Sequence, residues 1–120
     1  MIGIDVVAIK RIEALSEYAK KRIFHPVELE QAEAIAKPAD FLAGRFAVKE
    51  AFFKAVGKGM KTLSTQDIWT IKAEDGSPQI QLSPKAQALV KDCTVSLSIS
   101  HDEPVAVAVV LILGGTHGAF

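Results

Sequence analysis

The stretch GRFAVKEAFFKAVGKG, residues 44–59, decides how the rest of the chain is arranged. Its apolar side chains follow helical spacing, and we predict a long helix from about Asp40, as N-cap, to Val56, with Gly57 as its C-terminal stop. A helix this apolar leaves no separate solvent face for its four charged residues, which are Arg45, Lys49, Glu50 and Lys54. The partners of these charges are the central question of the sequence.

The length and composition of the chain limit the possible architectures and settings. With 120 residues, 49% of them hydrophobic, the chain is long enough for one modest core, and we expect a single domain over residues 1–114 followed by a flexible tail, 115–120. The longest apolar run, Val105–Leu113, is too short to span a bilayer, so no membrane association is expected. The N-terminus lacks the pattern of a signal peptide. Cys93 is the only cysteine, which excludes an internal disulfide and fits a reducing, cytoplasmic setting.

The formal net charge is zero, which argues against general nucleic-acid binding. The charges are unevenly distributed, however, and two segments of the chain are basic. Residues 45–61 hold five basic side chains and one acidic side chain, a local charge of +4. Residues 10–22 hold five basic and two acidic side chains, a local charge of +3. One interpretation is a pair of solvated helix faces. The other is two anionic partners, one for each patch.

Alternation and turn signals predict the remaining elements. The first half is expected to hold a strand over 2–7 and helices over 9–22 and 27–36, the second helix ending before Pro38. The second half is expected to hold two strands joined by the Gly-Ser-Pro turn at 76–78, a short helix with Ser83 as N-cap, and a final hairpin with a buried last strand. The predicted fold class is α+β, a largely antiparallel sheet packed on one long central helix.

Asp5 and His101 are the first candidate functional residues. Asp5 lies inside an apolar strand, where an ionised carboxylate needs a partner. The alternative is that Asp5 ends the strand and caps the following helix. His101 follows the strand SLSIS at the mouth of a tight turn, where it is either a turn residue or a ligand-binding one.

On the long helix, Glu50 and Lys54 share one stripe. Their neighbours on it are three small residues, Ala43, Ala47 and Ala51. We predict a shallow trough in which a ligand lies against the helix; the alternative for the two charges is an i,i+4 ion pair. The following GKGMK segment, 57–61, suits close approach of a phosphate, although a helix cap followed by a loop has the same pattern. Two carboxylates, several bases and a histidine together predict magnesium-assisted chemistry on a phosphoanhydride.

The order of these pieces resembles the holo-acyl-carrier-protein synthase family, the small 4′-phosphopantetheinyl transferases. The resemblance rests on GIDVVAIKRI at 3–12 and FLAGRFAVKEAFFKAVGKG at 41–59, supported by DGSP at 75–78 and SLSISHDEPVAVAVV at 96–110. It implies the 4′-phosphopantetheinyl transferase fold. It also implies magnesium-dependent transfer of phosphopantetheine from coenzyme A to a serine of an apo acyl carrier protein, releasing adenosine 3′,5′-bisphosphate, as in fatty acid biosynthesis.

By matching position, the resemblance implies that Asp5 and Glu50 are magnesium ligands and that Lys54 pairs with the coenzyme A phosphates. Either Glu50 or a water molecule on the metal would take the serine proton. The other implied coenzyme A contacts are Arg45, Lys49, Gly57, Lys58, Gly76, Pro78 and His101, the last also counted with the catalytic residues.

The resemblance further implies a homotrimer with active sites between protomers, and an acidic carrier protein docked on the first helix through Arg11 and Arg22. Two other functions remain open at this point. One is a non-catalytic module that binds coenzyme A or a carrier protein, and the other is a magnesium-dependent phosphohydrolase or nuclease.

Overall fold

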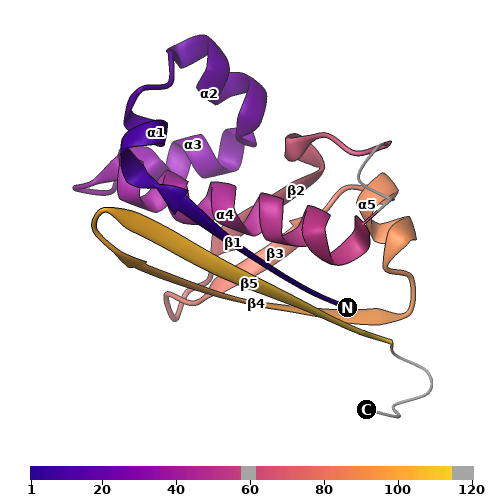
Figure 1. The fold of residues 1–120 in the computed structure, drawn as a ribbon. Coiled ribbons are helices and arrows are strands. Elements are labelled where there is room, and N and C mark those ends of the chain that lie inside the picture. The colour runs from indigo at the N-terminus through magenta and orange to yellow at the C-terminus, as the bar shows by residue number, and fades with distance from the viewer. Residues whose placement is uncertain (58–61, 115–120) are drawn as a thin grey trace.

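The computed structural model describes residues 1–57 and 62–114 and lays one long helix, α4 (Pro38–Val56), across a three-stranded sheet (Figure 1). The sheet has the order β1-β5-β4 and is antiparallel throughout, with β1 spanning Ile2–Ala8, β5 Val105–Gly114 and β4 Cys93–Asp102. This arrangement confirms the predicted fold class. The predicted hairpin of the last two strands is present, and β5 is the central strand.

Successive side chains along each strand point alternately to the face covered by α4 and to the outer face of the sheet. In β1, Gly3 and Val7 are buried whereas the intervening Ile4 and Val6 are exposed. Asp5 shares the covered face with Gly3 and Val7. It pairs in register with Ala108 of β5, which pairs on its other side with Ile99 of β4.

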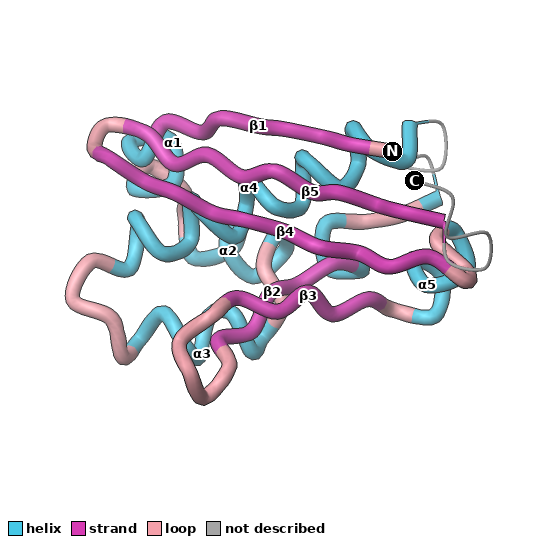
Figure 2. The backbone as a smooth tube through the Cα atoms, turned by 90° about the horizontal axis from the view of Figure 1, so that it is seen from below, coloured by secondary structure: helices cyan, strands magenta, loops and turns pink. Residues whose placement is uncertain are grey.

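A second, two-stranded sheet is formed by β2 (Ile68–Lys72) and β3 (Pro78–Leu82), and it lies beside β4 (Figure 2). The predicted turn joins them, with Gly76 at a φ of +87°, a conformation that favours glycine. The 3₁₀ helix η2 (Thr65–Asp67) precedes this hairpin. The short helix α5 (Pro84–Leu89) follows it, and the predicted Ser83 cap is present, since the hydroxyl accepts from the Ala86 amide.

The helix predicted over 9–22 is two helices, α1 (Ile9–Glu13) and α2 (Glu17–Ile23). The break has a local cause, because Ser16 is extended and its hydroxyl accepts from the Ala19 amide at 3.0 Å, starting α2 afresh. The next helix, α3 (Pro26–Glu33), is shorter than predicted and begins with its proline at the first position.

The bounds of α4 correct one prediction and confirm another. Asp40 is not the N-cap, because the helix begins at Pro38 and Asp40 is buried within its first turn. Gly57 ends the helix as predicted, at a φ of +63°.

The three small residues of the α4 stripe do not form a ligand trough. Ala43, Ala47 and Ala51 are fully buried, and α4 packs with this face against β1 and β5. The closest approach is at Gly3, where an added Cβ would lie 1.9 Å from the carbonyl oxygen of Ala51. The alanines and Gly3 therefore serve to bring strand and helix together, which also places Asp5 near the charged end of the stripe.

Within residues 1–57 and 62–114, no helix is long and apolar enough to cross a membrane. Lys58, the neighbouring glycine and lysine of the GKGMK segment, and the predicted tail over 115–120 lie outside the described residues.

Candidate active site

Asp5 lies at the edge of the sheet, in the middle of β1 rather than at its end. The strand continues to Ala8, and that residue, not Asp5, precedes α1 without any side-chain cap. The Asp5 side chain is 16% exposed and faces α4. The alternative that Asp5 ends the strand and caps the helix is therefore wrong, and its charge is met by a residue on another element.

That residue is Lys54, at the end of α4. Its Nζ lies 3.0 Å from Oδ1 of Asp5 and donates a second hydrogen bond, 3.1 Å long, to the carbonyl oxygen of Ile4. The i,i+4 ion pair considered for Lys54 and Glu50 is thus replaced by a pair across 49 positions of sequence. Lys54 stays 57% exposed, so its ammonium group remains reachable from solvent.

Glu50 precedes Lys54 by one helical turn and completes the cluster. Burial raises the pKa of Glu50 above its usual value, and the negative charge of Asp5 adds to the shift. The positive charges of Arg11 and Lys54 oppose it. The charge of Asp5 is felt at Glu50, so the fold brings the two carboxylates near each other, although they are 45 positions apart in sequence.

Asp5 and Glu50 fit a magnesium ion in the chemistry of their donors. Both offer carboxylate oxygens, the ligands that hard divalent cations prefer. In the described part of the chain, no group of three or more His, Cys, Asp or Glu side chains is placed to hold a metal. A cation bound here would take its remaining ligands from substrate oxygens and water, which is how Mg²⁺ is commonly held at phosphate-transfer sites.

A second cluster forms around Arg45, on another stripe of α4. The guanidinium group lies 3.7 Å from the centre of the Phe41 ring, and its Nε is buried with no hydrogen-bond partner among the described residues. Burial lowers the pKa of Arg45, and the charge of Glu28 opposes this effect. A buried guanidinium with an unused donor favours an anionic ligand.

A cavity of about 240 Å³ opens beside Arg45, and His101 at the end of β4 lines it. Nδ1 of His101 lies 3.9 Å from Oδ2 of Asp40, beyond hydrogen-bond distance but within the range of charge attraction when the histidine is protonated. The structure thus brings Arg45 and His101 to one cavity, and their contact with coenzyme A stays a prediction. Asp40 is an additional lining residue, which sequence reasoning took for a helix cap.

The position of Lys49 contradicts the prediction that this residue contacts a phosphate. Its side chain is fully buried, and Nζ lies 2.7 Å from Oε1 of Glu28 on α3. The same nitrogen donates to the carbonyl oxygens of Thr65 at 2.8 Å and Ile68 at 2.5 Å. An ammonium group has three donors, and all three are used inside the protein. Lys49 is therefore a structural residue that joins α4 to α3 and β2.

Glu28 was not singled out in the sequence, although it is the partner of Lys49. Its carboxylate also accepts from the amides of His25 and Thr70, at 3.0 Å each. The only local signal is the position of Glu28 three residues after His25, which forms a capping box with it at the start of α3.

The other predicted contacts are dispersed. Gly76 lies in the turn between β2 and β3, Pro78 begins β3, and Gly57 ends α4. Arg11 and Arg22 are exposed, on α1 and α2 respectively. Their roles as coenzyme A and carrier contacts remain predictions.

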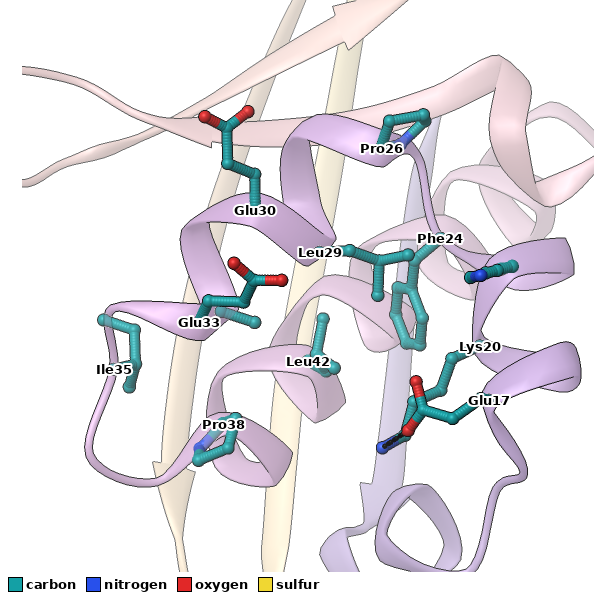
Figure 3. A pocket seen from close by; sticks show the side chains of 12 residues that line it. Glu17, Lys20, Phe24, Pro26, Leu29, Glu30, Glu33, Ile35, Pro38 and Leu42 are labelled. Carbon is teal, nitrogen blue, oxygen red and sulfur yellow. Dashed lines mark ion pairs between the residues drawn. The ribbon is translucent and has the colours of Figure 1, made fainter.

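A wider groove of about 700 Å³ lies between α2, α3 and the start of α4 (Figure 3). Phe24, Leu29 and Leu42 line its floor, and the Glu17–Lys20 ion pair, at 3.5 Å, lies on its rim. The groove contains neither Asp5 nor Glu50 nor Lys54, so its size does not make it the reaction site.

Comparison with known proteins identifies the family of this chain. The family described as the 4′-phosphopantetheinyl transferase superfamily matches residues 1–110. Holo-[acyl-carrier-protein] synthase from Geobacillus kaustophilus is 44% identical over 117 residues, which cover 92% of this chain and 86% of that protein. The enzyme of the same name from a Nitratiruptor species is 42% identical over 118 residues, covering 94% and 98%.

Two solved structures give the same result. The holo-(acyl-carrier-protein) synthase from Bacillus anthracis in complex with CoA (3′,5′-ADP) is 36% identical, with a TM-score of 0.80 and 96% of each chain covered. The Helicobacter pylori enzyme in complex with coenzyme A is 38% identical, with a TM-score of 0.80 and coverage of 93% and 99%. Sequence and fold agree, and this chain belongs to the holo-acyl-carrier-protein synthase family of 4′-phosphopantetheinyl transferases.

Proposed function

We propose that the protein transfers the 4′-phosphopantetheine group of coenzyme A to a serine hydroxyl of an apo acyl carrier protein, with Mg²⁺, and releases adenosine 3′,5′-bisphosphate. The observation that carries this proposal is the cluster of Asp5 on β1 with Glu50 and Lys54 on α4, two carboxylates and a lysine. The relatives named holo-[acyl-carrier-protein] synthase and the coenzyme A complexes support the choice of substrates. Fatty acid biosynthesis in the cytoplasm is the setting that we propose.

In this proposal, Asp5 and Glu50 hold the metal and Lys54 pairs with the diphosphate of coenzyme A. The metal, when bound, neutralises charge that develops at the phosphorus and on the leaving phosphate. Glu50 is one candidate base for the serine hydroxyl. Water beside the metal is the other candidate.

Arg45 and His101 would bind the distant phosphate and the nucleotide end of coenzyme A. Both residues line the cavity beside Ile99 of β4. Asp5 of β1 and Ile99 of β4 flank Ala108 of the central strand, so Asp5 lies at the opposite edge of the sheet from Arg45 and His101. Neighbouring strands are about 4.8 Å apart, which separates the two edges by roughly 10 Å with α4 lying over the sheet between them. One coenzyme A molecule would therefore bind most simply where the β1 edge of one protomer meets the β4 edge of another.

The outer face of the sheet supports assembly of this kind. Ile2, Ile4 and Val6 of β1 are 66%, 60% and 60% exposed, and Leu111 continues the face on β5. Rows of exposed β-branched and leucine side chains on one sheet face are typical of a protein–protein interface. We propose that this face packs against other copies in a homotrimer, which would place active sites between protomers.

The carrier protein would dock on α1 and α2. Arg22 donates to the Tyr18 hydroxyl at 3.0 Å, and both side chains project from the exposed face of α2. Arg11 lies closer to the reaction centre, since its positive charge opposes the rise in the pKa of Glu50. An acidic carrier helix would thus meet positive charge that leads from α2 towards the metal ligands.

The test is to incubate the protein with coenzyme A, Mg²⁺ and an apo acyl carrier protein and to measure the mass of the carrier. The expected result is a carrier heavier by one phosphopantetheine group, with loss of the reaction when EDTA replaces Mg²⁺. Asp5→Asn and Glu50→Gln, which keep side-chain size, should each abolish transfer, whereas Glu30→Gln on the exposed face of α3 should not.

The same assay separates the other two functions. A binding module would leave the carrier mass unchanged in the presence of both substrates. A phosphohydrolase would consume coenzyme A without modifying the carrier. Either result would contradict the proposed transfer.

A further inference from the structure

Lys54 places a positive charge beside the Asp5 carboxylate, where a metal ion bound to Asp5 would also place one. Its ammonium group contacts Oδ1 of Asp5 at 3.0 Å and the carbonyl oxygen of Ile4 at 3.1 Å. It also follows Glu50 by one helical turn. The lysine is therefore already a cation for the carboxylate pair, supplied by the chain itself.

The cluster needs such a cation. The Asp5 side chain is only 16% exposed, and Glu50 is close enough for the charge of Asp5 to be felt there. Two carboxylates in a partly dehydrated place repel each other, and a nearby positive charge offsets this repulsion. Lys54 is 57% exposed and has a long, flexible stem, so it can swing away without unfolding the helix end.

A divalent cation and this ammonium group compete for the same carboxylate. A metal that binds Asp5 while Lys54 stays in contact with it would meet a like charge within a few ångströms, and such repulsion is costly where water is limited. A diphosphate arriving with coenzyme A offers Lys54 another partner and the metal further oxygen ligands.

We propose that Lys54 is the resident counter-ion of Asp5 in the ligand-free protein, and that it has to leave Asp5 before a divalent metal binds. This inference rests on the metal role of Asp5 in the proposed function. Its consequence is that metal and coenzyme A bind cooperatively, because coenzyme A draws Lys54 away and the released carboxylate then accepts the metal. Coupling of this kind is reciprocal, so the metal should tighten coenzyme A binding by the same factor.

The test measures Mn²⁺ binding by electron paramagnetic resonance, without any activity assay. In the absence of coenzyme A, Lys54→Met should bind Mn²⁺ on the order of tenfold more tightly than the wild-type protein, since a repelling charge is gone. Lys54→Arg, which keeps the charge, should resemble the wild type. Lys20→Met is the matched control, because it removes a lysine from an ion pair with Glu17 on α2, and it should change nothing.

A second measurement needs no variant. Coenzyme A should tighten Mn²⁺ binding to the wild-type protein, after subtraction of Mn²⁺ bound by coenzyme A alone, and the gain should be smaller in Lys54→Met. Equal Mn²⁺ affinity of wild type and Lys54→Met, or no effect of coenzyme A on the wild type, would overturn the role of Lys54 while leaving the metal assignment in place. Unchanged Mn²⁺ binding after Asp5→Asn would overturn the metal assignment itself, and the role of Lys54 with it.

Discussion

Replacement of Lys49 by methionine gives the sharpest test of what the charges on α4 are for. The side chains of Lys49 and Glu28 are both 0% exposed, and they form a 2.7 Å ion pair. Methionine has nearly the same length as the stem of lysine but carries no charge. In the variant, the carboxylate of Glu28 stays buried without its cation, and two carbonyl oxygens, of Thr65 and Ile68, lose their donor.

The expected cost is large. Removing one partner of a buried ion pair costs about 3–5 kcal/mol, because the remaining charge is left without compensation. Domains of this size are stable by about 5–15 kcal/mol, so the variant should remain folded but close to its limit. The double variant Lys49→Met/Glu28→Gln should recover part of the loss, because the unpaired buried charge is gone. The recovery should be incomplete, because the amides of His25 and Thr70 bond to different oxygens of Glu28 and glutamine has only one acceptor oxygen.

Urea unfolding followed by circular dichroism measures these free energies. Lys20→Met, which breaks the exposed pair with Glu17, is the control and should cost no more than about 1 kcal/mol. In the folded fraction of Lys49→Met, the Michaelis constant for coenzyme A should stay near the wild-type value. A loss of stability below about 1 kcal/mol, combined with a coenzyme A constant raised tenfold or more, would refute the structural role and restore Lys49 as a phosphate contact.

Three further predictions concern the strand, a helix cap and the docking surface. Gly3→Ala should cost several kcal/mol and reduce transfer, because its Cβ would lie 1.9 Å from a backbone oxygen of α4. Gly44→Ala should cost less, because its Cβ would meet a side-chain methyl of Ile99 at 2.9 Å rather than backbone; urea unfolding of both variants checks this. Burial lowers the pKa of His25 below its ordinary value of 6.5, and its Nδ1 caps α3 by accepting a backbone amide hydrogen. The contribution of neutral His25 to stability is therefore present above pH 6.5 and lost as pH falls through the folded-state pKa. Urea unfolding over a pH series should show this loss in the wild type and not in His25→Asn. Arg22→Glu should raise the Michaelis constant for the carrier, and less so at high salt, with the coenzyme A constant unchanged; equal constants for the carrier at low salt would contradict docking on α2.

Periodicity and local turn chemistry were enough for much of the fold. The alternation of β1 and of the final hairpin, the Ser83 cap before Pro84 and the stop at Gly57 all depend on residues close together in sequence, and each was predicted correctly. Family membership followed from motifs that are continuous in the chain. Boundaries failed where a local competitor was overlooked, as at Ser16, whose hydroxyl starts a new helix.

Only the tertiary structure decided which charges on α4 are buried in ion pairs and which stay open to solvent. The helical stripe placed Glu50 and Lys54 together correctly, but sequence spacing does not show that Lys54 reaches Asp5 across the β1 edge. Nor does it show that Lys49 lies in the core, because its partner Glu28 belongs to a separate helix and the burial of both depends on how α3 and β2 pack on α4. A buried ion pair and a ligand-binding lysine have the same signature in sequence, and what distinguishes them is the long-range packing that removes water from one and leaves the other exposed.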